Sequence, residues 1–295
     1  MKIGVAGVGK MGAAIAARLK EVGHDVAVWN RTSAKAEVLG AQGLEVCKTA
    51  RELATRSDVV VTIVTNAEAQ AAIYGGADGL VAGGAAQKTF LDMSTVRPDE
   101  MRAVAAMVRT AGAAFVECPV GGTVGPARQG KLLGLAGGTA DDFARVKPLL
   151  DQMCRRVEHL GDVGAGSAVK LAINLPLVVA YQALGEAYVL CRDLGLDATV
   201  LFDLFADTSG APTMLKLRGG TIAEGIAQGK FAPPAFDVDS IRKDLRTMIA
   251  EAQSMGARLP VAEETLRVFD QAAADGWGGR DGASLPAYWV QNATG

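Results

Sequence analysis

The sequence has few of the residues on which metal, disulfide and histidine chemistry depend. Its four cysteines are scattered and form no C-x-x-C pair, so neither a zinc site nor a disulfide scaffold is indicated. The two histidines, His24 and His159, lie far apart in the chain, and we interpret both as structural. We therefore expect no metal site, and we expect buried free thiols in a reducing compartment. The cysteines are Cys47, Cys118, Cys154 and Cys191.

An excess of one charge and long hydrophobic runs are also lacking. The 30 Lys and Arg residues nearly balance 32 Asp and Glu residues, and no basic arm or stripe suggests binding to nucleic acid or a membrane surface. The longest apolar run, residues 175–181, is shorter than the roughly 20 residues that a membrane span requires. No basic or Arg/Ser-rich leader precedes the first expected strand. These absences favour a cytoplasmic enzyme that acts on a small molecule.

Strand and helix patterns alternate through the first half of the chain. The alternation predicts an α/β fold with a doubly wound Rossmann domain, whose ligands bind at the carboxyl ends of the strands. We expect strands at residues 3–6, 26–29, 45–47, 58–64, 89–93, 114–118 and 132–136. Between them we expect helices at residues 13–20, 33–39, 50–57, 68–74 and 98–111.

The second half shows helical periods and no convincing strand. A long apolar helix is expected to follow Gly166 and to reach Leu194. Further helices are expected at residues 198–208, 214–224, 241–255 and 260–274. We therefore predict a Rossmann domain over residues 1–162 and an all-α domain over residues 163–295, joined by the long interdomain helix.

A glycine motif stands between the first expected strand and helix. Gly7, Gly9 and Gly12 form G-x-G-x-x-G, and a second strand follows within about thirty residues, the context that makes this motif specific. The glycines permit a tight turn, close approach of a pyrophosphate and helix–strand packing, while the helix N-terminus attracts phosphate. We expect this segment, including Lys10 and Met11, to bind a dinucleotide; a purely structural glycine turn is the alternative.

The end of the second expected strand bears on the choice of cofactor. An NAD site usually has an acidic residue there, but this chain has Trp29, Asn30, Arg31 and Thr32. Asn30, Arg31 and Thr32 offer uncharged or cationic donors to a 2′-phosphate, which a carboxylate would repel. The sequence therefore favours NADP(H) over NAD(H).

Lys170 is the main catalytic candidate. It lies in the apolar helical stretch, and Asn174, four residues later, projects from the same helix face. A lysine in apolar surroundings is costly to bury unless it has a function, although a lysine that snorkels near a helix start is an alternative.

With these motifs in order, the chain resembles the β-hydroxyacid dehydrogenase family over nearly its whole length. The resemblance rests on residues 7–12 with 30–32, 92–98, 119–130, 161–174 and 243–245. It implies reversible NADP-dependent reduction of a small anionic aldehyde, of the semialdehyde or glyoxylate type, to a hydroxyacid. Lys170 would be the general acid in reduction and the base in oxidation, and Asn174 would orient the substrate.

The resemblance also implies further contacts. Cofactor contacts are expected from Thr65, Asn66, Thr95 and Lys243. Substrate contacts are expected, beside Lys170 and Asn174, from Gly121, Gly122, Thr123, Phe236 and Asp244. For Asp244, a charge at a helix start is an equal alternative.

The sequence departs from the family pattern at three positions. Gly121 replaces the family serine that helps to bind the substrate carboxylate, although backbone N–H groups of residues 121–123 can still form an anion nest. The missing side chain leaves room for a bulkier head group, so a sulfolactaldehyde-type reductase is an alternative. Ile173 replaces a frequent asparagine, and Pro176 is expected to kink the long helix.

Two further alternatives and an assembly follow from the same residues. Imine-reducing relatives usually have Asp or Tyr where this chain has Lys170, and a non-catalytic NADP-binding protein would be expected to lose that lysine. The apolar surface of the long helix suggests a homodimer or homotetramer.

Overall fold

The computed structural model describes residues 1–191, 194–208 and 213–292. The chain divides into two compact units, Met1–Lys170 and Leu171–Gly295.

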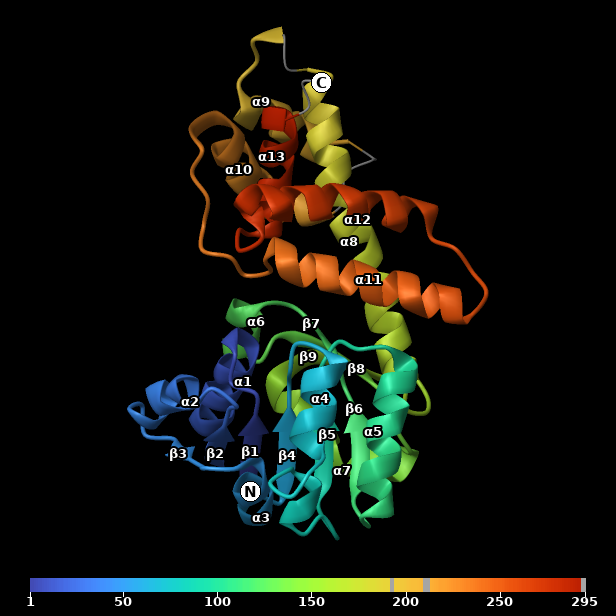
Figure 1. The fold of residues 1–295 in the computed structure, drawn as a ribbon. Coiled ribbons are helices and arrows are strands. Elements are labelled where there is room, and N and C mark those ends of the chain that lie inside the picture. The colour runs from blue at the N-terminus through green and yellow to red at the C-terminus, as the bar shows by residue number, and fades with distance from the viewer. Residues whose placement is uncertain (192–193, 209–212, 293–295) are drawn as a thin grey trace. The chain divides into compact units, whose positions relative to one another are not determined.

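The first unit is built on a six-stranded parallel sheet with the order β3-β2-β1-β4-β5-β6 (Figure 1). This order reverses direction between β1 and β4, whose carboxyl ends therefore flank the topological switch point. The predicted doubly wound sheet is confirmed. Its strands are β1 (Lys2–Ala6), β2 (Asp25–Trp29), β3 (Glu45–Val46), β4 (Val59–Thr62), β5 (Thr89–Asp92) and β6 (Ala114–Glu117).

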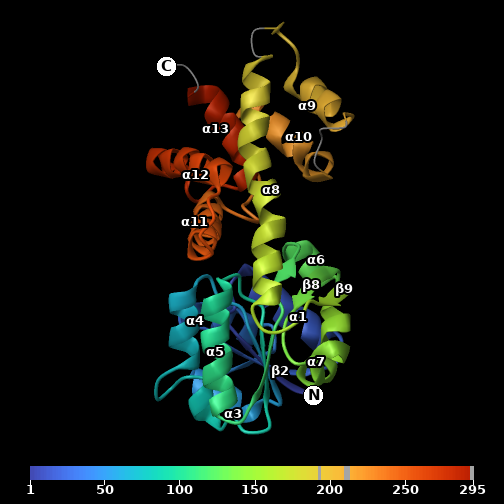
Figure 2. The same ribbon diagram turned by 90° about the vertical axis from the view of Figure 1, so that its right-hand side faces the viewer.

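Helices cover both faces of this sheet, as Figure 2 shows. Alternate strand residues point to opposite faces, so Ile3 and Val5 pack in one apolar core and Ala6 in another. The first core is closed by α1 (Lys10–Glu21), α2 (Ser33–Gly40) and α7 (Ala140–Met153). The second is closed by α3 (Ala50–Arg56), α4 (Ala67–Tyr74) and α5 (Pro98–Thr110), with a short 3₁₀ turn at Val81–Gly83.

A small second sheet follows β6. It has the order β7-β8-β9, with β7 (Val120–Gly121) antiparallel and β9 (Cys154–His159) parallel to β8 (Leu132–Ala136), and α6 (Val124–Arg128) precedes β8. Helix α7 and strand β9 were not expected from the sequence. Pro148 lies inside α7, and β9 contains Arg155, Arg156 and Glu158, so neither element shows an uninterrupted pattern.

In its described residues the second unit is helical, as predicted. After α8 (Ala165–Val189) come α9 (Ala198–Ala206), α10 (Thr213–Gln228), α11 (Val238–Ser254) and α12 (Pro260–Ala272). A π-helical segment (Ala273–Trp277), a 3₁₀ turn (Gly282–Ser284) and α13 (Leu285–Asn292), which were not expected, complete the unit. The expected end of the long helix at Leu194 was wrong, because α8 ends at Val189; residues 192 and 193 lie outside the described residues.

Helix α8 runs without interruption through Pro176. Among the helices of the described chain, α8 alone is long and apolar enough to cross a membrane, judged by length and composition. Its longest uninterrupted apolar run, residues 175–181, is short. Its residues Leu171, Val178, Tyr181 and Leu184 are buried in the apolar core of the second unit. A core helix of this kind satisfies the same criterion, so the length of α8 is weak evidence for a membrane span.

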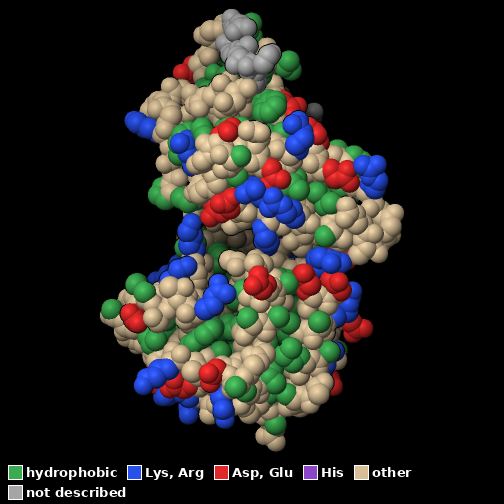
Figure 3. Space-filling view, in the orientation of Figure 1, with side chains coloured by type: hydrophobic (Ala, Val, Ile, Leu, Met, Phe, Trp, Pro, Cys, Tyr) green, Lys and Arg blue, Asp and Glu red, His purple; other side chains and the backbone are tan. Residues whose placement is uncertain are grey.

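Acidic and basic side chains are interspersed on the face of each unit that Figure 3 shows. This mixture agrees with the near balance of charges in the sequence.

Candidate active site

The glycine motif forms the turn between β1 and α1. Gly7 has a φ of 92°, and a Cβ added to it would overlap the carbonyl oxygen of Ile63. A Cβ at Gly12 would overlap the carbonyl oxygen of Gly7. At Gly9, which caps the N-terminus of α1, an added Cβ would meet no protein atom within 4 Å. The turn thus presents bare backbone and a helix N-terminus, as a dinucleotide pyrophosphate requires.

The end of β2 supports this turn through Asn30. Its Oδ1 accepts a hydrogen bond from the Val8 N–H at 3.1 Å, and its Nδ2 donates to the Thr32 carbonyl oxygen at 3.0 Å. Thr32 is the N-cap residue of α2 and its side chain makes no capping hydrogen bond. Both ends of the Asn30 side chain therefore bind backbone, and Asn30 carries no charge. The positive charge at this strand end comes from Arg31, which is exposed.

Buried polar side chains join the ends of β4 and β5. The Asp92 carboxylate accepts hydrogen bonds from the Ser94 N–H at 2.9 Å and from Gln70 Nε2 at 3.0 Å. The Ser94 hydroxyl in turn accepts from the Val64 N–H at 3.0 Å. Burial raises the pKa of Asp92, and these donors oppose the rise. The network fixes the segments that carry Thr65 and Thr95. This role of Asp92 depends on tertiary contacts and was not predicted from the sequence.

Asn66 stands beside Thr65 at the start of α4. Its Oδ1 accepts a hydrogen bond from the Ala69 N–H at 2.9 Å, which makes Asn66 the N-cap of that helix. The cap bond orients the Asn66 side chain, so its Nδ2 and its backbone are the groups that its predicted contact with the cofactor would use.

The predicted substrate loop contains two glycines in different situations. Gly122 has a φ of 124°, and its added Cβ would lie 2.9 Å from Leu132 Cδ2, so the backbone requires glycine there. Gly121 has no positive φ, and its added Cβ would meet only the Leu133 side chain, at 3.4 Å or more. A side chain at position 121 is therefore sterically acceptable. Thr123 follows as the N-cap residue of α6 and makes no side-chain cap.

The two catalytic candidates lie one turn apart on α8. Lys170 is the last residue of the first unit and is only 8% exposed, whereas Asn174 belongs to the second unit and is 9% exposed. Such burial is unusual for a lysine and argues against a freely snorkelling side chain.

Asn174 takes part in a polar cluster of the second unit. Its Nδ2 donates to Asp244 Oδ2 at 3.2 Å, and Lys243 Nζ pairs with Asp244 Oδ1 at 2.5 Å. Asp244 is 3% exposed and lies in the second turn of α11, which begins at Val238. The alternative that placed Asp244 at a helix start was therefore wrong. The structure brings together three predicted site residues, Asn174, Lys243 and Asp244.

Phe236 lies in the loop before α11. The N–H groups of Ala235 and Phe236 donate to Asp281 Oδ2 at 2.8 and 3.4 Å, and the Phe236 carbonyl oxygen accepts from the Gly282 N–H at 2.8 Å. Asp281 is almost fully buried and so fixes this loop. The sequence alone gave no signal for that contact because Asp281 is 45 residues away.

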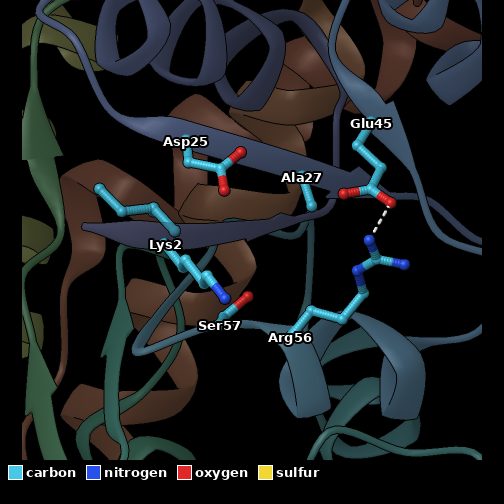
Figure 4. Close-up of a pocket in the computed structure, with 7 residues that line it drawn as sticks. Lys2, Asp25, Ala27, Glu45, Arg56 and Ser57 are labelled. Carbon is cyan, nitrogen blue, oxygen red and sulfur yellow. Dashed lines mark ion pairs between the residues drawn. The ribbon is translucent and has the colours of Figure 1, made fainter.

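A hollow of about 320 Å³ lies elsewhere in the first unit (Figure 4). Lys2, Asp25 and Ser57 line it together with an ion pair between Arg56 and Glu45. Lys2 and Asp25 begin β1 and β2, so the hollow lies at the amino ends of the strands. The glycine turn lies at the opposite, carboxyl ends, and this hollow is therefore separate from the candidate site.

Comparisons with known proteins agree with this arrangement. The model of the NAD-binding domain of 6-phosphogluconate dehydrogenase matches residues 2–161, and the model described as NAD-binding of NADP-dependent 3-hydroxyisobutyrate dehydrogenase matches residues 164–289. A 3-hydroxyisobutyrate dehydrogenase of Pseudomonas aeruginosa is 33% identical over 273 residues, 91% of each chain. The chain belongs to the β-hydroxyacid dehydrogenase family. It is accordingly an oxidoreductase with NAD(P)-binding domains.

Two further members of the β-hydroxyacid dehydrogenase family match nearly the whole chain. Glyoxylate/succinic semialdehyde reductase 1 of Arabidopsis thaliana is 30% identical over 95% of this chain and 96% of its own length. The solved structure of 3-hydroxyisobutyrate dehydrogenase of Mycobacterium tuberculosis with L-serine has a TM-score of 0.85 and 29% identity. That match covers 97% of this chain and 98% of the other.

Proposed function

We propose that this dehydrogenase uses NADP(H) to reduce a small anionic aldehyde, of the semialdehyde or glyoxylate type, reversibly to its hydroxyacid. The buried Lys170, one helical turn from Asn174, is the observation that carries the proposal. The glycine turn fits a dinucleotide because no protein atom lies within 4 Å of an added Cβ at Gly9, so a ligand can approach the backbone there. The exposed Arg31 favours the 2′-phosphate of NADP(H).

In the proposed reaction, bound NADPH supplies the hydride. Lys170 donates a hydrogen bond to the carbonyl oxygen and then its proton, as negative charge develops on that oxygen. In the oxidative direction the neutral amine accepts the proton again. An alanine at position 170 would leave the developing charge without a cationic donor.

Asn174 would hold the substrate, and Asp244 would hold Asn174. Because Asp244 accepts an amide N–H of Asn174, this contact fixes the orientation of the Asn174 amide group. Lys243 keeps the Asp244 carboxylate paired and so stabilises its charge in a buried position. Lys243 and the segments with Thr65, Asn66 and Thr95 are the proposed cofactor contacts beside the glycine turn, in which Lys10 and Met11 begin α1.

The proposed site for the anionic group of the substrate is the loop at residues 121–123, with Phe236 as a wall of the pocket. Gly121 gives this loop no side-chain hydroxyl, so recognition would depend on backbone N–H groups and on Thr123. The steric freedom at Gly121 favours one alternative, a head group bulkier than a carboxylate, such as a sulfonate. Imine reduction has less support because Lys170 occupies the position of the proton donor.

We also propose a homodimer or homotetramer in the cytoplasm. Large apolar side chains are exposed in the second unit, among them Leu190, Val200, Leu204 and Leu217. Large apolar side chains left exposed in this way are often covered by another subunit. Light scattering after size exclusion would measure the assembly, and a monomer at micromolar concentration would contradict it.

The decisive experiment replaces Lys170 by alanine. With NADPH and a panel of glyoxylate, succinic semialdehyde, tartronate semialdehyde, methylmalonate semialdehyde, sulfolactaldehyde and a cyclic imine, kcat should fall by ~10²–10⁴-fold for the preferred substrate. NADPH affinity, measured by fluorescence titration, should stay near the wild-type value. Lys216→Ala removes an exposed lysine of α10 and is the matched control. Near-normal turnover of the Lys170 variant would reject the assigned role.

A further inference from the structure

A buried carboxylate connects the end of β6 with the start of α8. Glu117 is fully buried and is the last residue of β6, directly before residues 118–123 that lead into the substrate loop. Its Oε1 accepts hydrogen bonds from the N–H groups of Gly164 at 2.5 Å and Gly166 at 2.9 Å. Its Oε2 accepts from the Ser167 hydroxyl at 2.5 Å. All of these residues belong to the first unit.

The surrounding backbone is shaped to admit this carboxylate. A Cβ on Gly137 would overlap Glu117 Oε1, and Gly137 and Glu117 exchange two backbone hydrogen bonds, of 2.9 and 3.0 Å. A Cβ on Gly166 would lie 3.2 Å from the same oxygen and would overlap the carbonyl oxygen of Leu135. Larger residues at positions 137 and 166 would displace either the carboxylate or the helix start.

The chemistry of these contacts favours an ionised acceptor. The two backbone N–H groups can only donate, and the Ser167 hydroxyl lies within donating distance. A carboxylate accepts from all three, whereas an amide would require the Ser167 hydroxyl to turn and accept instead. The negative charge also lies at the N-terminus of α8, where the helix dipole stabilises it. Burial raises the pKa of Glu117, and the hydrogen bonds oppose that rise. A carboxyl group buried with this set of donors joins the end of β6 to the start of α8.

We propose that Glu117 is a positioning residue that fixes the first turn of α8 and, through it, the placement of the Lys170 amine. Ser167 precedes Lys170 by three residues and lies on the adjacent turn of the same helix side, so a shift of the first turn moves Lys170 with it. The same carboxylate belongs to the strand that leads to the substrate loop. One residue therefore fixes the positions of both the proton donor and the loop. This inference rests on the proposed catalytic role of Lys170.

The test compares three variants. Glu117→Gln keeps the size of the side chain but turns an NH₂ group toward at least one donor. Glu117→Asp keeps the carboxylate but shortens the side chain. Ser167→Ala removes one donor only. Because misplacement of a reacting group by about 1 Å can cost ~10²-fold, kcat of Glu117→Gln should fall by about 10- to 100-fold. Ser167→Ala should lose about 3- to 10-fold.

Three additional measurements separate positioning from a general structural defect. Affinity for NADPH should stay within about twofold, amide exchange at residues 165–170 should accelerate, and the solvent deuterium isotope effect on kcat should rise because proton delivery becomes slower. If Glu117→Gln does not fold, Ser167→Ala provides the same readouts with the charge retained. An active variant with accelerated exchange, or an unaltered isotope effect, would overturn the inference.

Lys170→Ala measured in parallel distinguishes the two proposals. Full activity of Lys170→Ala would remove the proposed function itself. An inactive Lys170→Ala beside fully active Glu117 and Ser167 variants would overturn only the positioning role.

Discussion

Replacing Arg31 by alanine should weaken NADPH binding much more than NADH binding. Arg31 is the charged residue at the end of β2. The neighbouring Asn30 is uncharged, and the two ends of its side chain bind the Val8 N–H and the Thr32 carbonyl oxygen. The 2′-phosphate distinguishes the two cofactors, so a contact between that phosphate and Arg31 affects one of them only.

The expected size follows from the exposure of Arg31. A hydrogen bond to a charged group contributes about 1.5–3 kcal/mol, and solvent screening at an exposed side chain moves the value to the lower end. A loss of about 1–2 kcal/mol corresponds to a dissociation constant for NADPH that is ~5- to 30-fold higher. The constant for NADH should change by less than about threefold, and the NADPH effect should shrink with added salt.

Fluorescence titration with each cofactor at two salt concentrations measures these constants. Lys35→Ala is the matched control, because it removes an exposed cation from the following helix, α2. Asn30→Asp keeps an acceptor for the Val8 N–H and adds the acidic group that an NAD site has, so it should lower NADPH affinity and preserve NADH affinity. Equal losses for both cofactors in Arg31→Ala would refute recognition of the phosphate.

Four other substitutions test the remaining parts of the site. Gly121→Ser should fold normally, because the added Cβ makes only ordinary contacts, and should raise kcat/KM for small carboxylate aldehydes relative to bulkier head groups in the substrate panel. Gly12→Ala should lower the melting temperature, because the added Cβ overlaps the Gly7 carbonyl oxygen at a cost of about 1–3 kcal/mol. Gly9→Ala should leave the melting temperature unchanged but lower the affinity for the dinucleotide, measured by titration. Asp244→Asn should raise KM and lower kcat by roughly tenfold, because it leaves Lys243 without its carboxylate; unchanged steady-state kinetics would contradict this role for the cluster.

The fold could be predicted where local patterns are strong. The β-branched run of β4 and the glycine turn before α1 are readable because each signal lies within one element. Element α7 was missed because Pro148 interrupts a helical period, and β9 because its charged residues obscure a strand at the edge of a small sheet. The π-helical segment and α13 were missed for a related reason, since neither shows a regular apolar period of useful length.

The sequence predicts residue types for the site but not the partners of those residues. Lys170 and Asn174 could be paired from sequence because they are one helical turn apart. The acceptor of the Asn174 amide is 70 residues away on α11, and the partners of Glu117 are 47 to 50 residues away. Pairings of this kind depend on tertiary packing, which no local pattern encodes.

The glycines of the site separate the constrained parts of this enzyme from the part that is free to vary. Gly7 and Gly12 are required by contacts with backbone atoms, and Gly122 by its positive φ. Gly121 is required by neither, because its backbone and its surroundings would accept a side chain. If residues 121–123 bind the substrate as proposed, a change at position 121 should alter substrate preference and leave the cofactor turn, the helix start at Glu117 and the cluster at Asp244 in place. Substrate preference within this scaffold should accordingly be decided at position 121, and the Gly121→Ser panel measures that directly.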